Sequence, residues 1–394
     1  MSTANRVHVP RWKRESDLVM GRGVNPYQTP RRELPVDKVL LAIVLGITLF
    51  GAVMVYSASA ILAEKNYGSQ FYFLSRQAIW ALVGLGAMAV ALSIDYRNYK
   101  KPAVIYTMLA VTFVMLIAVL FLPRVNETHR WIRYGRYFSL QPSEPAKLVL
   151  IAFLGFFLEK QIREIENFKR TFLRAAIVAF LLIGLVGAEP DLGTAMALGI
   201  VFLTMMFQAG TPVRYFAALA LPVVPAMTYM LLKPWRFARL LAFIDPWKYQ
   251  TTYGFQPVQS MIAIGSGGPA GVGFAQGRQK LFYLPAPHTD FIFAVIGEEL
   301  GLIGAATLVL LFALLAWRGF RAARFAPDLF GRLLAVGLTT MIIAQAFFNI
   351  SVTLSLVPTK GIPLPFVSAG GSSLAISLFA AGVLLNVSKH GRPA

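Results

Sequence analysis

The feature that most constrains this chain is its alternation of long apolar runs with polar segments. An apolar run of about 20 residues is long enough to cross the roughly 30 Å hydrocarbon core of a bilayer as a helix. Runs of about this length or slightly shorter recur along the whole sequence. We therefore expect an all-α polytopic membrane protein with ten transmembrane helices, near residues 39–56, 76–94, 102–122, 145–159, 172–187, 193–208, 213–232, 290–317, 333–356 and 370–387.

The composition supports a single membrane domain. Only 14% of the residues are charged, whereas a soluble protein carries about a quarter. The sequence predicts a basic tail over residues 1–38, a transmembrane domain over 39–388 and a short C-terminal segment over 389–394. The first apolar run is longer than the roughly 7–15 residues of a signal-peptide core, so we expect it to remain as the first span.

The net charge of +19 is spread over the N-terminal tail and the loops. The predicted loops fall into two sets, one with 12 Lys and Arg in 39 residues and the other with 12 in 116. Because basic loops stay in the cytoplasm, we place the first set and both termini there. The long loop 233–289, between the seventh and eighth spans, is then extracytoplasmic. This distribution argues against nucleic-acid binding, and the absence of cysteine excludes disulfides and thiolate metal sites.

The first candidate site begins the fourth span. A charge inside a bilayer costs about 2.5 kcal/mol or more, so ionisable side chains in or beside spans are strong functional signals. Ser143 is the expected N-cap, Glu144 lies in the first turn, and Lys147 shares its face of the helix. Two interpretations stay open: a capped helix start with a local ion pair, or a polar site facing the interior of the bundle.

Two more carboxylates stand where spans begin. Asp191 is most simply the N-cap of the sixth span. Asp290 can cap the eighth span, but it also ends the long outer loop, with His288 nearby. Partial burial there would raise its pKa towards the range of a general base. We therefore take Asp290 as the candidate base, and expect Glu298, deeper in the same span, to meet a polar partner.

The last outer loop is a candidate anion site. Gly370 and Gly371 are followed by Ser372 at a helix start, and such a segment can present backbone N–H groups to an anion. Lys360 would add positive charge, and Ser368 a hydroxyl group. The alternative is an ordinary glycine-hinged turn.

The glycine-rich run over residues 265–273 does not predict nucleotide binding. It lacks the third glycine of the dinucleotide fingerprint and the Gly-Lys pair of a P-loop, and the predicted topology places it away from cytoplasmic nucleotides. We interpret it as flexible backbone that approaches a substrate closely.

These segments, in this order among ten spans, resemble the SEDS family of bacterial cell-wall glycosyltransferases, the FtsW/RodA/SpoVE group. The basic tail of more than 30 residues is most like the division-type FtsW branch. The resemblance runs from about residue 37 to 388 and rests on Tyr56-Ser-Ala-Ser59, Arg76-Gln77, Gln141-Pro-Ser-Glu144 with Lys147, Pro190-Asp-Leu-Gly193, Gln259-Ser260, His288-Thr-Asp-Phe-Ile-Phe-Ala294, Gly297-Glu-Glu-Leu-Gly301 and the segment 358–373.

The resemblance implies an enzyme that polymerises lipid II into glycan strands on the outer face of the cytoplasmic membrane. Its implied partners are a class B penicillin-binding transpeptidase and other division or elongation proteins, and it implies neither nucleotide nor haem. The family's essential outer-loop aspartate maps onto Asp290. Glu144, Lys147 and Asp191 map onto positions that line the family's cavity.

In the implied reaction, a sugar hydroxyl of one lipid II attacks the anomeric carbon of another and displaces undecaprenyl pyrophosphate. Asp290 fits the base, while Lys147, Lys360 and Arg133 are candidates for binding the pyrophosphate. A divalent cation, Mg²⁺ or Mn²⁺, is another source of positive charge. Two other classes stay open, a lipid II flippase and a noncatalytic scaffold that recruits a transpeptidase, but the outward position of the base favours the polymerase.

Overall fold

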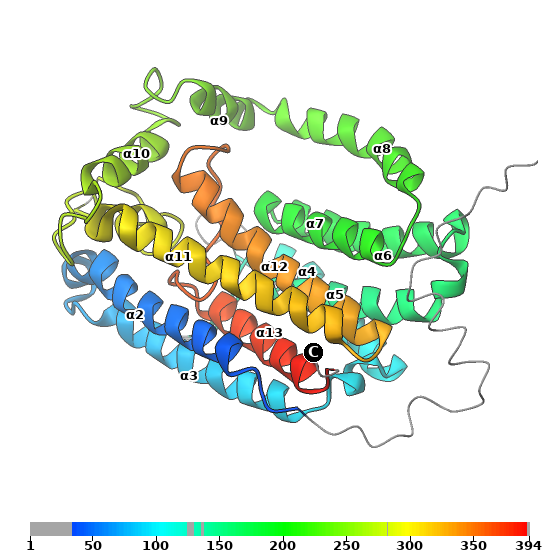
Figure 1. The fold of residues 1–394 in the computed structure, drawn as a ribbon. Helices are drawn as coiled ribbons and strands as arrows, with labels where there is room; N and C mark the ends of the chain where they lie inside the picture. The colour runs from blue at the N-terminus through cyan, green and yellow to red at the C-terminus, as the bar shows by residue number, and fades with distance from the viewer. Residues whose placement is uncertain (1–33, 124–129, 135–137, 282, 392–394) are drawn as a thin grey trace, which may run out of the picture.

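The computed structural model describes residues 34–123, 130–134, 138–281 and 283–391, and its regular structure is almost entirely helical (Figure 1). One short antiparallel hairpin joins β1 to β2. In chain order the elements are α2 (Lys38–Tyr67), α3 (Tyr72–Ser93), η1 (Tyr96–Lys100), α4 (Pro102–Leu120), β1 (Ile132–Tyr134), β2 (Phe138–Leu140), α5 (Ser143–Lys160), η2 (Ile162–Glu164), η3 (Phe168–Phe172), α6 (Leu173–Ala188), α7 (Leu192–Gln208), α8 (Val213–Leu231), α9 (Pro234–Ile244), α10 (Phe255–Gly267), α11 (Ile292–Phe325), α12 (Leu329–Thr353) and α13 (Gly371–Lys389).

A helix occupies each of the ten predicted positions. Seven helices in the described ranges are long and apolar enough to cross a membrane, and α5, α7 and α8 fall short by length or composition. The predicted all-helical membrane fold is therefore confirmed at this level. The long segment 233–289 is not structureless, because it contains α9 and α10. Of the predicted basic tail, only residues 34–38 lie within the described part of the chain.

Two helices extend further than predicted. α2 continues to Tyr67, well past the predicted end at residue 56, and the first polar side chains beyond that end are hydrogen-bonded inside the protein. The Ser57 hydroxyl contacts the Glu299 carboxylate at 2.6 Å, and Ser59 Oγ donates to a carbonyl one turn back. α11 continues to Phe325, where its basic last turns lie beyond the apolar run.

The bundle is arranged around α12 and α13, the two most buried of its apolar helices. α13 packs along α3, while α12 contacts α5, α7 and α11. α2 lies against α3 and α11 at one side, and α6 and α7 form the other side (Figure 1). α8 stands apart from this bundle over most of its length, and only its first turns reach it, where Tyr215 is buried against Phe172.

α11 is broken at Gly301, which adopts a left-handed φ of 63°. The preceding loop fills the break: Val272 N donates to Glu298 O at 3.0 Å, and Gly273 N donates to Glu299 O at 3.1 Å. A Cβ on Gly271 would collide with the same backbone. Irregular backbone at membrane depth is tolerated where protein satisfies its polar groups. The glycine-rich run thus packs against α11, and this contact explains its composition.

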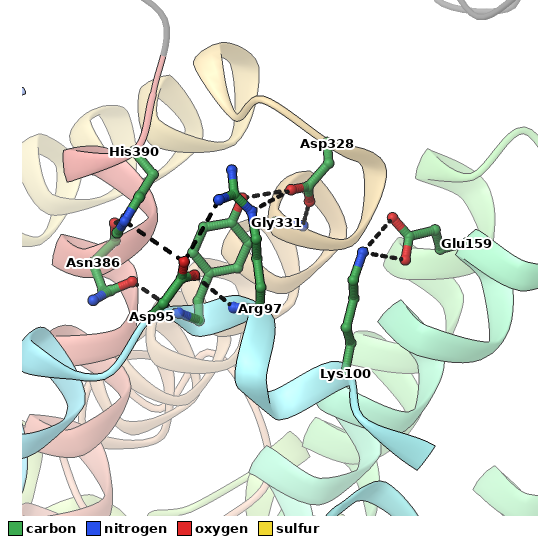
Figure 2. A network of polar contacts seen from close by, with 9 residues as sticks. Asp95, Arg97, Lys100, Glu159, Asp328, Gly331, Asn386 and His390 are labelled. Carbon is green, nitrogen blue, oxygen red and sulfur yellow. Dashed lines mark hydrogen bonds and ion pairs between the residues drawn. The ribbon is translucent and has the colours of Figure 1, made fainter. Parts of the chain in front are cut away.

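A network of paired charges joins η1 to the end of α5 and the start of α12 (Figure 2). Lys100 bonds Glu159 at 3.1 Å, and Arg97 Nε reaches Asp328 at 3.4 Å. The buried Tyr96 hydroxyl donates to Asp328 at 2.6 Å. Asp328 also caps α12, accepting from the Gly331 N–H at 2.7 Å. These contacts connect η1 to α5 and α12.

Candidate functional site

Asp290 lies at the junction of the two predicted outer loops. It ends the α10–α11 connection, and its carboxylate is so close to Gly361 that a Cβ there would lie 2.6 Å from Oδ2. Asn349 on α12 donates from Nδ2 to Asp290 O at 2.8 Å and to Ile362 O at 2.7 Å. No residue in the described ranges donates a hydrogen bond to the Asp290 carboxylate. The side chain is therefore available as an acceptor.

Further hydrogen bonds lock the loops together. Ser368 Oγ donates to Thr289 O at 2.6 Å and accepts from Leu364 N at 2.8 Å. Ala369 N donates to His288 O at 2.9 Å. Two segments that the sequence singled out separately, 288–290 and 360–369, thus form one structure around Asp290.

The surroundings of Asp290 raise the pKa of its carboxyl group above the usual value. Burial raises the pKa of Asp290 to about 6, with the Arg130 charge opposing this rise and the Asp191 charge adding to it. Burial lowers the pKa of His288 to about 4, so its imidazole is neutral near pH 7. The ring of His288 packs on Phe73, with centroids 4.3 Å apart. His288 therefore supports the loop as a neutral aromatic group.

Asp191 is the N-cap of α7, as predicted. Its carboxylate accepts from Thr194 N at 3.1 Å and from the Thr194 hydroxyl at 2.9 Å. Gln141 Nε2 donates to the same carboxylate at 2.8 Å and to Ser143 Oγ at 2.9 Å. Gln141 N lies 3.4 Å from Ser372 Oγ, which connects this group to the start of α13.

Glu144 and Lys147 form a buried ion pair. Lys147 Nζ lies 2.9 Å from Glu144 Oε2 and 2.9 Å from Gln345 Oε1, and only 1% of Lys147 is exposed. Gln345 Nε2 in turn donates to Pro363 O at 3.4 Å. The pair therefore faces the interior of the bundle, as the second interpretation predicted. Because the ammonium group is enclosed, it orders Glu144 and Gln345 instead of presenting a free charge.

Two predicted helix caps are wrong. α5 begins at Ser143 itself, after Pro142, and no side chain caps it. α11 begins only at Ile292, so Asp290 lies outside the helix and the residue before the helix, Phe291, offers no capping side chain. Each of the two side chains has a different role from the predicted one. The Ser143 hydroxyl accepts from Gln141, and the Asp290 carboxylate lies against Gly361.

The last-loop residues are used mainly within the protein. Ser368 and Ser372 are buried, and Gly371 lies so close to the Trp80 indole that no side chain fits. Gly370 is the N-cap residue of α13, without a side-chain cap. This close packing gives Gly371 and the two serines a structural reason, whereas a Cβ at Gly370 would make only ordinary contacts.

Two glutamates of α11 hold the loop that leads to Asp290. Glu298 accepts from the backbone N–H groups of Arg278 and Gln279, at 2.6 and 3.1 Å from Oε1. Glu299 pairs with the buried Lys280 at 2.5 Å and accepts from Ala275 N at 3.0 Å. The predicted polar partner of Glu298 is thus the loop backbone itself, and this anchoring positions the segment that carries Asp290.

Sequence reasoning missed a group of charges beside Asp191. Arg130 Nε donates to Glu189 O at 2.9 Å, and the fully buried Glu189 has its pKa raised to about 8, first by burial and then by Asp191. Arg236 and Arg239 of α9 lie within electrostatic range of Lys360. The spacing of three residues between Arg236 and Arg239, on an otherwise apolar helix, is the sequence signal that could have indicated this group.

Two of the predicted cations, Lys360 and Arg133, lie in different parts of the structure. Lys360 Nζ lies 2.8 Å from Met196 Sδ on α7, close to the Asp191 cap. Arg133 lies on β1 opposite Ser139, and its side chain is outside the described part of the chain. Within the described ranges, no three His, Asp or Glu side chains gather as a metal cage. The carboxylates here therefore do not by themselves fit a resident divalent cation.

The fold and the site define the class of this protein. It is an all-helical membrane protein with a half-buried carboxylate between two loops. The chain belongs to the FtsW/RodA/SpoVE family of cell cycle proteins, whose family model matches residues 37–393. This family is the SEDS family, so the family resemblance drawn from the motifs is confirmed.

Curated relatives cover almost the whole chain. A probable peptidoglycan glycosyltransferase FtsW of Geobacter metallireducens is 42% identical over 357 residues, which are 89% of this chain and 94% of the relative. The stage V sporulation protein E of Bacillus subtilis is 41% identical over 361 residues, 90% of this chain and 98% of the relative. FtsW relatives are multi-pass proteins of the bacterial cytoplasmic membrane.

Solved structures share the fold. A chain from a peptidoglycan synthase complex that coordinates polymerization and crosslinking superposes with a TM-score of 0.75 at 28% identity, covering 90% of this chain and 98% of that one. The rod shape determining protein RodA of Thermus thermophilus gives a TM-score of 0.66 at 26% identity, covering 92% and 99%.

Proposed function

We propose that this chain is an FtsW-like peptidoglycan glycosyltransferase that polymerises lipid II during cell division, with Asp290 as the general base. The observation that carries the proposal is the Asp290 carboxylate itself. It is half-buried, accepts no hydrogen bond from the described residues, and has a pKa raised to about 6 by burial. A base with such a pKa is largely ionised at pH 7 and still accepts a proton readily.

The reaction is a single displacement. The hydroxyl oxygen of the acceptor sugar forms a bond to the anomeric carbon of the donor, and the bond from that carbon to the diphosphate oxygen breaks. The hydroxyl proton passes to Asp290, and the electron pair of the broken bond leaves with the undecaprenyl pyrophosphate. Attack opposite the leaving group inverts the anomeric configuration. A divalent cation, Mg²⁺ or Mn²⁺, would neutralise the diphosphate and would have to be held largely by it, since no three acidic or His side chains of the described ranges gather as a cage.

We place the site on the outer face of the membrane, with ten crossings and both termini in the cytoplasm. The distribution of Lys and Arg among the loops supports this orientation. The segment 233–289, with α9 and α10, then lies outside between the seventh and eighth crossings.

We further propose a class B penicillin-binding transpeptidase as partner, together with other division proteins. The similarity to a chain from a peptidoglycan synthase complex supports this pairing. Since glycan strands need crosslinking after polymerisation, a transpeptidase on the same outer face would receive the product directly.

Asp290→Asn tests the base. The amide keeps the size of the side chain but cannot accept the proton, so strand synthesis from lipid II should fall by about 10²–10⁴-fold. The assay uses the purified full chain with its transpeptidase in detergent, where there is no bilayer to flip lipid across. The matched control is Asp245→Asn, since Asp245 is an exposed acid at the end of α9. Near-normal synthesis by Asp290→Asn would remove this residue from the mechanism.

Single cysteines test the orientation, because the chain has none of its own. A membrane-impermeant thiol reagent should label Ser266→Cys in intact spheroplasts and miss Ser16→Cys. Ser266 is exposed near the end of α10, so lack of labelling there cannot be ascribed to burial in the protein. The reverse pattern would invert the proposed topology.

A further inference from the structure

An aromatic surface lies at the turn between α2 and α3, at the end of the bundle where α11 begins (Figure 1). Tyr67 ends α2 and Tyr72 begins α3, and their rings stack with centroids 3.9 Å apart and planes 8° from parallel. Gly68 between them adopts a left-handed φ of 71°, and its N–H donates to Glu64 O at 2.9 Å. The chain therefore reverses sharply enough to lay one ring on the other.

Ring contacts connect this surface to the candidate site. Phe73 lies edge-on to both tyrosines, with its centroid 5.7 Å from that of Tyr67 and 5.2 Å from that of Tyr72. The Phe73 ring also packs on His288 at 4.3 Å, and His288 precedes Asp290 by two residues. A continuous series of rings therefore leads from the turn to the loop that carries Asp290.

The surface is open to a ligand. Tyr67 is 46% exposed and Phe71, the residue before α3, is 52% exposed. Exposed aromatic groups that lie together mark interaction sites more often than single ones do. The same turn carries exposed amide and hydroxyl groups, on Asn66, Ser69 and Gln70. Aromatic faces beside uncharged hydrogen-bonding groups match a sugar ring, which has an apolar face of C–H groups and a polar edge.

Aromatic side chains at the ends of membrane helices also settle in the lipid interface. That role accounts for an exposed ring such as Phe121, which is 84% exposed just after α4 and makes no ring contact within the described ranges. It does not account for the stacked tyrosines and their connection to His288. Rings that are already packed against one another lose little freedom when a ligand binds, which favours binding.

We propose that the aromatic surface formed by Tyr67, Phe71 and Tyr72 binds the sugar rings of the growing glycan strand. This inference rests on the proposed function and names the place where the product of that reaction is held. A glycan strand is too polar for the hydrocarbon core, so it must leave the Asp290 loop along the protein or through water. Stacking on flat rings suits a polymer, since every sugar of the strand offers the same kind of C–H face.

Binding of soluble glycan strands, freed of peptide and lipid, to the purified full chain in detergent tests the proposal without turnover. Tyr67→Leu/Phe71→Leu keeps apolar bulk but removes the ring faces, so the Kd should rise about tenfold. Tyr67→Phe/Phe71→Tyr keeps both rings and should bind as the unaltered chain does. The matched control is Phe121→Leu, which removes an exposed ring at another helix end and should leave binding unchanged.

The design separates this inference from the proposed base. Asp290→Asn should still bind glycan strands, so lost synthesis with retained binding supports both assignments. If synthesis does not depend on Asp290, the binding results still decide the role of the aromatic surface.

Four results would overturn the proposal: no binding by the unaltered chain, unchanged binding by Tyr67→Leu/Phe71→Leu, or a tenfold loss in either Phe121→Leu or the variant that keeps both rings. If the double leucine variant does not purify folded, Phe71→Leu alone carries the test. A loss of about threefold is then expected, because one of two stacking faces remains, and unchanged binding would contradict the proposal.

Discussion

The two ends of the helix bundle hold charged groups that are arranged in opposite ways. At the end formed by η1, α5 and α12, charges of opposite sign are paired (Figure 2). Lys100 bonds Glu159, and Arg97 and the Tyr96 hydroxyl converge on Asp328. Each of these contacts connects one helix end to another, so the network's role is to hold the fold.

At the candidate site, groups of the same sign approach one another. Asp290 lies within electrostatic range of Asp191, and Lys360 within range of Arg236. Such an arrangement adds nothing to folding stability, because like charges in a partly buried region repel. The comparison teaches that a carboxylate held close to another carboxylate, as Asp290 is to Asp191, marks the place where a charged substrate and a proton are handled. Paired charges, even when deeply buried, mark structure.

The Glu144–Lys147 ion pair gives the sharpest test, since its two charges have opposite signs and yet lie beside the candidate site. Lys147→Met should destabilise the fold by about 3–5 kcal/mol, because it leaves a buried carboxylate without its cation. Glu144→Gln/Lys147→Met removes both charges and should recover much of that loss, as a thermal melt in detergent would show. If the double variant is stable but inactive, the pair also takes part in the reaction, and the division between paired and unpaired charges fails here.

Asp328→Ala tests the opposite end. It removes the α12 cap and leaves the buried Tyr96 hydroxyl without its acceptor, for a combined cost of about 2–4 kcal/mol. The melting temperature should fall, while strand synthesis per folded molecule stays unchanged. Asp95→Ala, at a more exposed acid of the same network, should cost less than about 1 kcal/mol. A turnover defect in folded Asp328→Ala would contradict the structural role.

Of the three tests of this comparison, the pH profile of strand synthesis should show the smallest effect. The base must be ionised to act, so activity should be high above the Asp290 pKa of about 6 and fall below it. Between pH 7.5 and pH 5 the rate should drop about tenfold, as for one titrating group. His288 does not titrate in this window, since its pKa is about 4. Glu189→Gln should leave the acid limb unchanged, and loss of that limb in this variant would assign it to Glu189 instead.

Local patterns were sufficient for much of the fold. The ten apolar runs predicted helices at the right places because hydropathy and length are properties of each segment alone. The ends were less accurate: α2 runs on to Tyr67, and Ser57, just past its predicted end, donates to Glu299 of α11. The cap proposed at Asp290 failed because its carboxylate lies against Gly361 of a distant segment, whereas Ser143 is already the first residue of α5 and accepts from Gln141.

The sequence by itself determined the membrane class, the helical positions, the Asp191 cap and the family motifs that single out Asp290. Each of these follows from residue types at short spacing along the chain. Only the tertiary structure decided that Asp290 lies against Gly361, that Lys147 is enclosed with Glu144, and that α9 arginines approach Lys360. The physical reason is that burial and the Coulomb interaction depend on distance in space, and the bundle brings together segments that are far apart in the chain.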